Sequence, residues 1–365
     1  MTQIPKPTSS SPTPSSPTSS TSVAPNQDVQ ALEDLRRAYS AIRSELSKAI
    51  VGQNAVIEEL LIAILTGSHA LLVGVPGLAK TLLISSIAQT LDMSFKRIQF
   101  TPDLMPTDIT GTEVIHQDQA SGERSFKFLK GPIFANVVLA DEINRTPPKT
   151  QASLLEAMQE RHVTVGGNEH VLPHPFFVLA TQNPVEQEGT YPLPEAQLDR
   201  FLFMIQVDYP TAAEELQIMR AATGGGLGKP DKVLGAAQII ALQQLIRRVP
   251  VADHVLQYAQ RIVSATRVKT PDALEVCTQF LTWGAGPRAS LGLILAGKAR
   301  AALSGRSFVS HDDVAAVAPS VLRHRIICSF NAASQGITTD EVIKRILGQI
   351  RKDQQFGDAS PARGA

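Results

Sequence analysis

A lysine and a threonine close a glycine-bearing loop in the first third of the chain, and both residue types can hold a polyphosphate. The apolar run 69–73 precedes the loop and a helical pattern follows it, which predicts a strand, a loop and a helix. In such a unit, backbone N–H groups and the positive end of the helix dipole surround phosphate groups. The residues expected to contact a nucleotide are Gly74, Val75, Pro76, Gly77, Leu78, Ala79, Lys80, Thr81 and Leu82.

Lys80 and Thr81 have separate expected roles in this loop. The ammonium of Lys80 would reach the β- and γ-phosphates, and the hydroxyl of Thr81 would bind Mg²⁺. The common pattern has glycine immediately before the lysine, whereas this chain has Ala79 there. The alternative interpretation is an ordinary strand-to-helix turn with a chance Lys-Thr pair.

Two adjacent carboxylates, Asp141 and Glu142, follow a second apolar run, residues 136–140. We expect Asp141 to bind Mg²⁺, directly or through a water molecule. Glu142 would orient and polarise the water that attacks the γ-phosphate. Phosphoryl transfer depends on positioning and charge neutralisation, so a metal, a lysine and a carboxylate suffice. The alternative is that the two residues form an acidic cap on the next helix.

Three further polar residues are candidates for contacts with the γ-phosphate. Asn183 ends a strand pattern, where its amide would hold this phosphate or the attacking water, although asparagine before proline is also a common turn residue. Arg200 lies at the end of a distant strand and could act across a subunit boundary, or it pairs with Asp199. Arg288 begins a helix, where a cation opposes the helix dipole unless an anion compensates it, which favours a phosphate contact.

The order of apolar runs and helical patterns indicates an α/β fold. After two helices, short apolar runs alternate with helical segments, which predicts a parallel sheet covered on both faces. Ligands bind at the carboxyl ends of such strands, where the glycine loop, Asp141 and Asn183 all stand. Val51 and Gly52 form a kink between the first two helices that would bring backbone close to the nucleotide. Taken alone, this kink is only a turn.

The chain is expected to divide into four segments. Residues 1–27 are rich in Ser, Thr and Pro, and we expect a disordered tail because they contain too little apolar surface to fold. Residues 28–222 form the α/β core, with two β-hairpin inserts at 112–129 and 161–172. Strand patterns then stop, which predicts an all-α domain at 223–352 and a flexible end at 353–365. Helical spacing of apolar residues starts the core at Asp28, and after the last strand it predicts helices at 211–222, 236–248, 253–267, 275–283, 288–304, 311–322 and 339–350.

The composition argues against several other classes of protein. Lys plus Arg and Asp plus Glu both number 34, so the net charge is zero and no global basic field attracts nucleic acid. No run of eighteen apolar residues predicts a membrane-spanning helix, and no secretory pattern begins the chain. Cys277 and Cys328 are too far apart for a disulfide framework or a metal motif. We therefore expect a cytoplasmic protein without membrane insertion.

Seven segments of the sequence resemble the AAA+ ATPases, and more narrowly the MoxR branch of that family. These segments are residues 51–53, 74–81, 139–145, 154–160, 180–184, 195–201 and 286–289. The resemblance implies a P-loop AAA+ core with a helical lid, ATP and Mg²⁺ as cofactors, and alanine as a common residue at position 79. It also implies that Asn183 is sensor one, that Arg200 is donated to a neighbouring subunit, and that Arg288 is sensor two on the lid.

The same resemblance implies partners and a biological role. Members of this family form a homo-oligomeric ring, usually a hexamer, and the two hairpins match the helix-two insert and the pre-sensor insert. They are thought to be chaperone-like motors that mature a protein client or help insert a metal cofactor. A partner with a von Willebrand A-domain is common. These implications rest on analogy with the family alone.

Three other functions remain open at this point. Related AAA+ proteins with the same hairpins translocate on DNA, but the hairpins here carry few basic residues, such as Lys127, Lys130 and Arg161. A chelatase-like motor for metal insertion is the second alternative. A nucleotide-gated scaffold without hydrolysis is the third, and the complete set of Lys80, Asp141 and Glu142 argues against it.

Overall fold

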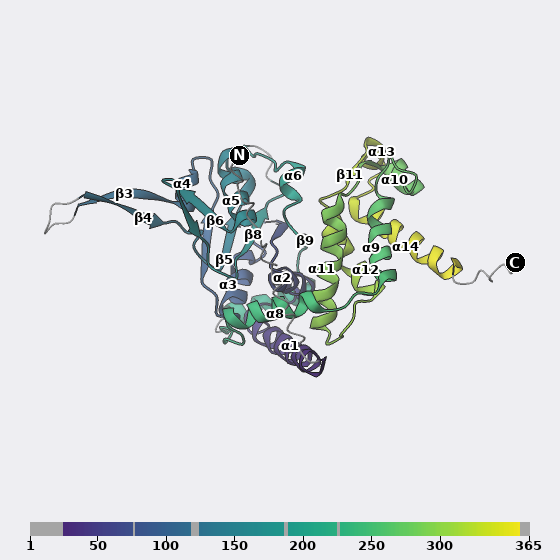
Figure 1. Ribbon diagram of the computed structural model, residues 1–365, viewed down its shortest axis with the longest axis horizontal. Helices are drawn as coiled ribbons and strands as arrows, with labels where there is room; N and C mark the ends of the chain where they lie inside the picture. The colour runs from purple at the N-terminus through teal and green to yellow at the C-terminus, as the bar shows by residue number, and fades with distance from the viewer. Residues whose placement is uncertain (1–24, 76, 118–123, 186–188, 225–226, 358–365) are drawn as a thin grey trace, which may run out of the picture.

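A five-stranded parallel sheet forms the centre of the first half of the molecule (Figure 1). The computed structural model describes residues 25–75, 77–117, 124–185, 189–224 and 227–357. In spatial order the strands are β2 (Phe95–Gln99), β5 (Val137–Asp141), β8 (Phe177–Gln182), β1 (Ala70–Gly74) and β9 (Phe203–Val207). All neighbouring strands are parallel, so their carboxyl ends lie at one edge. The α/β fold expected from the alternating pattern is confirmed.

Helices cover both faces of this sheet, because successive side chains of each buried strand point to opposite sides. The face that includes Leu72 packs against α1 (Pro25–Leu46), α2 (Asn54–Leu65) and α3 (Lys80–Thr90). The face that includes Leu71 packs against α5 (Pro148–Glu160). The two apolar clusters therefore form a three-layer domain with the sheet in the middle.

Two antiparallel hairpins extend from this domain. The first pairs β3 (Gly111–Gln117) with β4 (Arg124–Lys130), and the second pairs β6 (His162–Val165) with β7 (Asn168–Val171). The first hairpin projects far from the body of the molecule (Figure 1). Glycine is required where it begins, because Gly111 has a φ of 94° and an added β-carbon would lie 2.1 Å from the carbonyl oxygen of Leu129.

From residue 236 onward, the regular structure of the described residues is helical apart from one short two-stranded ribbon. Its helices are α8 (Ala236–Arg248), α9 (Asp253–Ala265), α10 (Glu275–Phe280), α11 (Pro287–Leu303), α12 (His311–Leu322), α13 (Phe330–Ser334) and α14 (Thr339–Gly357). Buried residues of α11 and α12, such as Leu293 and Val321, belong to the same apolar cluster as Leu72 in the sheet. This helical domain therefore packs directly on one side of the α/β domain. Three shorter connecting helices are α4 (Pro106–Thr110), α6 (Glu195–Leu198) and α7 (Ala212–Thr223).

The observed helix limits differ from the predicted ones in three places. The first helix begins at Pro25, not at Asp28, and residues 1–24 of the expected tail lie outside the described residues. The helix predicted for 275–283 is wrong at its end, because β10 (Leu281–Trp283) pairs there with β11 (Ile327–Cys328). The last helix continues to Gly357, and residues 358–365 are outside the described part of the chain.

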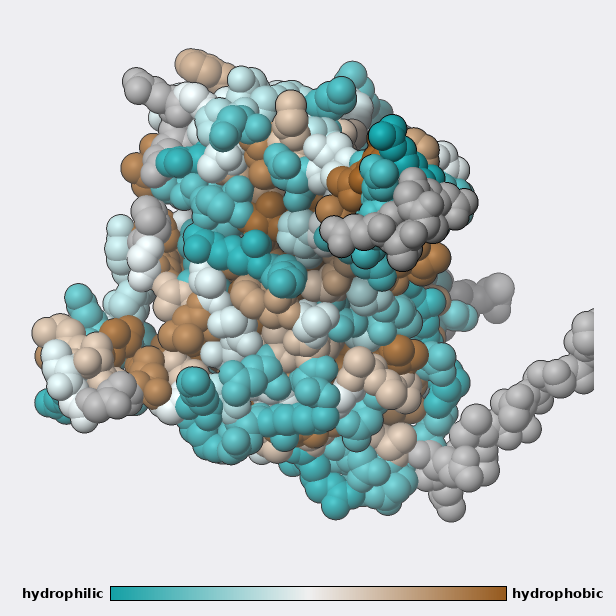
Figure 2. Space-filling view, turned by 90° about the vertical axis from the view of Figure 1, so that its left-hand side faces the viewer, coloured by the Kyte–Doolittle hydropathy of each residue, from teal (hydrophilic) through white to brown (hydrophobic). Residues whose placement is uncertain are grey.

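The surface carries scattered rather than continuous apolar side chains on the side from which the first hairpin projects (Figure 2). None of the helices within the described residues has the length and apolar character needed to cross a lipid bilayer. Cys277 is buried and Cys328 is half-buried, and both thiols are free. Burial raises the pKa of the Cys277 thiol to about 12, as expected for a packed apolar position.

Candidate nucleotide site

The loop between β1 and α3 lies at the carboxyl edge of the sheet. Gly77 and Ala79 both adopt left-handed backbone conformations, with φ values of 87° and 53°. Ala79 directly precedes α3, so a non-glycine residue holds a conformation that glycine adopts more easily. Residues 77–81 line a cavity of about 370 Å³. Pro76, which was expected to contact the nucleotide, lies outside the described residues.

Lys80 is held over the loop by the backbone of the preceding strand. Its Nζ donates a hydrogen bond to the carbonyl oxygen of Gly74. Partial burial lowers the pKa of Lys80, the charges of Asp141 and Glu142 raise it, and the lowering prevails. The two carboxylates thus act electrostatically on Lys80, so the loop and the end of β5 form one site.

Asp141 and Glu142 are joined through the hydroxyl of Thr181 on the adjacent strand β8. Thr181 Oγ1 donates to Asp141 Oδ1 at 2.6 Å and accepts from the backbone N of Glu142 at 2.9 Å. Glu142 has a left-handed φ of 58°, which turns the chain sharply away from β5 after Asp141. The threonine was not predicted as a site residue, and it fixes the relative positions of the two carboxylates.

Two residues of β2, Arg97 and Gln99, also belong to the site although the sequence did not reveal them. Arg97 donates to Asp141 Oδ2 from Nε at 3.0 Å and from Nη2 at 2.6 Å. Gln99 Nε2 donates to Glu142 Oε2 at 2.8 Å. Gln99 lies opposite Asp141 in the parallel register of β2 and β5, which explains these contacts. Each acidic residue of the pair therefore has a polar partner from the neighbouring strand.

Asn183 lines the same cavity, immediately after β8. Its side chain is buried, and Oδ1 accepts a hydrogen bond of 3.1 Å from the backbone N of Val185. This bond fixes the amide orientation within the turn and leaves its NH₂ group as a donor. Asn183 therefore lies at the end of the strand, as expected, and its side chain also forms a turn with Val185.

The kink at Val51 and Gly52 reaches the phosphate loop through the next residue. Gln53 Nε2 donates to the carbonyl oxygen of Leu78 at 3.3 Å. Gly52 has a φ of 69°, and an added β-carbon would lie 2.0 Å from Glu214 Oε1. Glycine suits position 52 because other residues rarely adopt this φ. The segment contacts the phosphate loop through Gln53, and its contact with a nucleotide stays a prediction.

The donor set at this edge of the sheet is suitable for Mg²⁺. In nucleotide enzymes this ion takes one or two ligands from the protein, and phosphates and water supply the others. Thr81 and Asp141 line the same cavity and provide a hydroxyl and a carboxylate. Within the described residues, no cluster of three or more His, Cys, Asp or Glu side chains forms a site for a metal held by protein alone.

Arg200 lies at the opposite edge of the sheet from the phosphate loop. It precedes β9, and the backbone N of nearby Leu202 donates to the carbonyl oxygen of His69, just before β1. The five residues of β1, at about 3.3 Å each, separate this edge from Gly74. The Arg200 side chain makes no hydrogen bond or ion pair with any described residue, so the alternative pairing with Asp199 is not found.

Arg288 lies beside Arg200 and not beside the phosphate loop. Both arginines line a cavity of about 310 Å³. Arg288 Nη1 is 3.5 Å from Asp199 Oδ2, so this carboxylate is the anion that compensates the cation at the start of α11. The expected contact between Arg288 and the nucleotide of its own chain does not fit this position. The structure separates the five polar residues of the loop edge from these two arginines.

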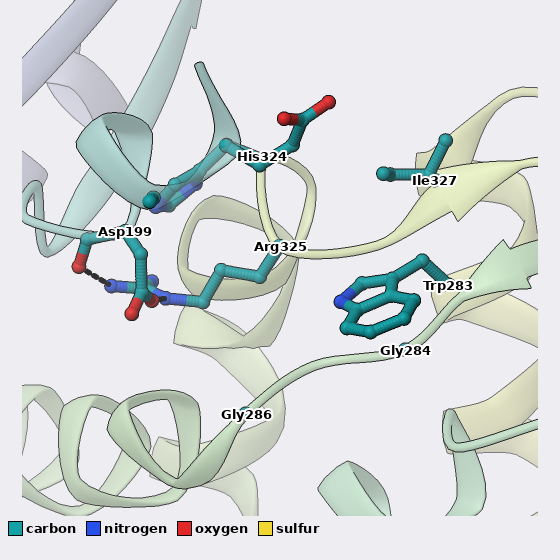
Figure 3. Close-up of a pocket in the computed structure, with 9 residues that line it drawn as sticks. Asp199, Trp283, Gly284, Gly286, His324, Arg325 and Ile327 are labelled. Atoms are coloured by element: carbon teal, nitrogen blue, oxygen red, sulfur yellow. Dashed lines mark hydrogen bonds and ion pairs between the residues drawn. The ribbon is translucent and has the colours of Figure 1, made fainter.

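A network around Asp199 orders the surface that carries the two arginines. Arg325 Nε donates to Asp199 Oδ1 at 2.7 Å, and its other nitrogens donate to backbone carbonyls that include those of Phe201 and Leu202. Asp199 and Arg325 border a cavity of about 580 Å³. Figure 3 shows Arg325 pointing toward Asp199, with Trp283 on the opposite wall. The network therefore fixes the residue directly before Arg200.

These features define the class of the protein. A phosphate loop, paired carboxylates and a polar strand end share one edge of a parallel sheet, and a helical domain packs beside it, as in P-loop ATPases of the AAA type. Residues 69–203 match the model of the ATPase family associated with various cellular activities (AAA), and residues 274–346 match the AAA lid domain.

Comparison with individual proteins narrows this class. The chain is 43% identical over 322 residues to the chaperone MoxR1 of Mycobacterium tuberculosis, which covers 88% of this chain and 83% of MoxR1. It is 30% identical over 310 residues to the protein MoxR of Methylorubrum extorquens, covering 81% and 89% of the two chains. A crystal structure from Cytophaga hutchinsonii, described as that of an ATPase, has 41% identity and a TM-score of 0.81, covering 88% and 97% of the two chains. The chain belongs to the MoxR family of AAA ATPases, so it is an ATP-hydrolysing enzyme.

Proposed function

We propose that this protein is a Mg²⁺-dependent ATPase that works as a ring of identical copies, and that the ring contains six of them. Each ATP site is completed by Arg200 and Arg288 of the adjacent copy. The observation that carries the proposal is the position of these arginines, at the sheet edge opposite the phosphate loop and on one surface.

Six copies is the ring size that the resemblance to the AAA+ family implies. In such a ring, each copy would present one nucleotide edge and one arginine-bearing surface to its neighbours. Such a head-to-tail contact uses two different surfaces of the same chain, and it closes into a ring when the rotation between copies permits. Arg200 has no partner among the described residues, and the Arg288 side chain is 55% exposed. Arg200 can therefore meet an anion on a second copy directly, and Arg288 can do so by exchanging its 3.5 Å contact with Asp199.

The residues at the carboxyl edge divide the work of phosphoryl transfer among them. Lys80 binds the β- and γ-phosphates and neutralises their charge, and Asn183 donates its amide to the γ-phosphate or to the attacking water. Thr81 and Asp141 hold Mg²⁺, which when bound supplies further charge neutralisation across the phosphates. Glu142 orients the water through its other oxygen, Oε1, while the hydrogen bond from Gln99 to Oε2 holds the carboxylate in place.

The two arginines of the adjacent copy supply the remaining positive charge. A guanidinium is permanently charged and offers a planar fork of donors, which suits the charge that develops on phosphate oxygens in the transition state. Arg325 and Asp199 hold the backbone beside Arg200 in place, so that its position relative to the neighbouring site is defined by the packing of the lid.

A protein client is favoured over nucleic acid by the surface of the first hairpin. Ile115 and Phe126 face each other across its strands and are 66% and 75% exposed, and Leu129 is 48% exposed. Exposed apolar side chains suit contacts with protein, whereas contacts with phosphates require a basic surface. The name of the mycobacterial relative supports a chaperone-like role. A partner with a von Willebrand A-domain and a cytoplasmic location complete the proposal.

The substitution Glu142→Gln tests the proposed chemistry. It removes the carboxylate that orients the water but preserves the shape of the side chain. The kcat for ATP hydrolysis is expected to fall at least about 100-fold, while the Kd for ATP changes less than about threefold. Glu33→Gln, an identical change at an exposed position of α1, is the matched control. An unchanged kcat at saturating ATP would rule out the role of Glu142.

A further inference from the structure

The helix α7, which follows the last strand of the sheet, has no buried residue. Its twelve residues make a helix of about 18 Å. A helix this short is marginal on its own and normally depends on the packing of one apolar face. Its first turn is nevertheless well formed, because the backbone N of Thr211 donates to Glu214 Oε2 at 2.8 Å in a capping box. The first turn of α7 is therefore stabilised by its cap, but no residue of the helix is buried against the rest of the described chain.

One side of α7 faces the rest of the chain. Glu214, Ile218 and Ala221 are spaced four and three residues apart, so they share one face of the helix. Glu214 and Ala221 are partly buried, and Ile218 is the least exposed of the large apolar residues of α7, at 37%. Glu214 covers Gly52 in the segment that borders the nucleotide site.

The opposite side of α7 is apolar and points to solvent. Leu216 and Met219 are three residues apart, so they are neighbours on that side, and they are 52% and 54% exposed. The solvent side of a surface helix is normally polar. We call Leu216 and Met219 the α7 face.

The place of α7 in the fold indicates what covers this face. Val207 at the end of β9 lies opposite Gly74 at the end of β1, so α7 begins at the sheet edge that carries the phosphate loop. In the proposed ring, this edge meets the surface of the next copy that carries Arg200 and Arg288. That surface has its own uncovered apolar side chain, Leu291, which is 72% exposed and lines the same cavity as the two arginines.

Leu291 is also positioned to act together with Arg288. The two residues are three apart on α11, so both project from the same side of that helix. An apolar contact at Leu291 would therefore fix the distance of Arg288 from whatever surface Leu291 packs against. The molecule thus carries one unpartnered apolar face beside its phosphate loop and another beside its two outward arginines.

We propose that α7 is the docking helix for a second copy of this chain. Its α7 face packs against Leu291 of the next copy, and this contact places that copy's Arg200 and Arg288 at the nucleotide. The inference rests on the proposed function, and it adds the elements that join the copies. It also gives a reason for the contact between Glu214 and Gly52, which ties the docking helix to the nucleotide segment.

Two defective variants, mixed together, test this head-to-tail contact. Leu216→Asp/Met219→Asp removes the α7 face, and Leu291→Asp removes the opposite surface. Light scattering with a non-hydrolysable ATP analogue is expected to show a ring for the wild type and monomers for each variant alone. An equimolar mixture is expected to give heterodimers, because one intact pair of surfaces remains between the two variants.

Several outcomes would overturn the proposal. Assembly of the α7 variant to the wild-type size would show that the α7 face is not in the contact, and a mixture that stays monomeric would show that Leu291 is not its partner. Leu256→Asp, at an apolar position of α9 that is 42% exposed, is the matched control and is expected to assemble normally. Binding of the ATP analogue by each monomeric variant verifies folding. A wild type that hydrolyses ATP at full rate as a monomer would instead remove the proposed function itself.

Discussion

At the scale of single residues, the charge balance around Asp141 controls the proposed Mg²⁺ site. Arg97 makes two hydrogen bonds to Asp141 Oδ2, and the arginine side chain is 47% exposed while that of Asp141 is 14% exposed. A divalent cation that takes this oxygen must displace the guanidinium. The two cations therefore compete for one carboxylate, and the arginine can swing into solvent when it is displaced.

Substitution of Arg97 by Gln is expected to strengthen the binding of Mg²⁺. The concentration of Mg²⁺ that half-saturates the binding of a fluorescent ATP analogue should fall about three- to tenfold, because the competing charge is gone. Lys96→Gln, on the same strand and exposed, is the control and should leave this concentration unchanged. Weaker binding of Mg²⁺ with nucleotide in the Arg97 variant would show that the guanidinium contacts phosphate instead of competing for Asp141.

The residues of this site differ in how far the sequence reveals them. Asp141 follows an apolar run directly, and Lys80 and Asn183 follow apolar runs within a few residues, so their common edge can be inferred from the parallel sheet alone. Arg97 and Thr181 reach the site because their strands, β2 and β8, lie on either side of β5. No local sequence pattern predicts the order of strands in a sheet. Polar residues near the carboxyl end of each strand were the signal that could have found them.

At the scale of elements, one buried carboxylate joins the start of α12 to its surroundings in the helical domain. The side chain of Asp313 is 0% exposed and accepts from Arg300 Nη1 at 2.9 Å and from Ser310 Oγ at 2.7 Å. Burial alone would raise the pKa of Asp313. Hydrogen bonds from Arg306 and Ser310 lower it by more than burial raises it, so the pKa lies below its ordinary value. Asp313 thus combines a helix cap with two ion pairs.

Asp313→Asn is expected to lower the free energy of unfolding by about 2 kcal/mol at pH 7, because the buried carboxylate that accepts from the partly exposed Arg300 and Arg306 is replaced by a neutral amide. A carboxyl whose pKa is lower in the folded state stabilises the protein above its unfolded pKa of about 3.9. That contribution is lost as the pH falls through the folded pKa, so the difference between wild type and variant should shrink in acid. Urea unfolding at pH 7, 5 and 3 measures it.

The adjacent residue provides the control for this prediction. Asp312 pairs with Arg351, and its side chain is 77% exposed. Asp312→Asn should therefore change the free energy of unfolding by less than about 1 kcal/mol at every pH. A difference for Asp313→Asn that stays equal from pH 7 to pH 3 would contradict the assigned role of its charge.

Periodicity revealed most of these elements but not how they pack. Helices such as α8 and α12 lie where the spacing of apolar residues placed them. The spacing predicts helix for Leu281–Trp283, because three residues are too few to show the alternation of a strand. The pairing of this strand with β11 joins residues distant in sequence, so no local pattern indicates it. The position of α7 was also predicted, whereas its lack of cover could only be seen in the fold.

At the scale of the whole molecule, the sheet separates two functional surfaces. The phosphate loop and paired carboxylates lie at its carboxyl edge, and Arg200 and Arg288 lie at the other. The sequence suggested a γ-phosphate contact for Arg288 but not its distance from the loop, because the placement of the helical domain depends on packing between α11, α12 and β9. In the proposed ring, each chain therefore supplies one half of two different sites, and two adjacent copies complete each site.

The rate of ATP hydrolysis by mixed subunits tests this central claim most directly. Glu142→Gln subunits and Arg200→Ala subunits should each be inactive alone. In an equimolar mixture, an Arg200→Ala subunit keeps its Glu142 and receives Arg200 from a Glu142→Gln neighbour, so about a quarter of the sites regain both residues. The account predicts recovery of about a quarter of the wild-type rate; a mixture that assembles but stays at the background rate would contradict it.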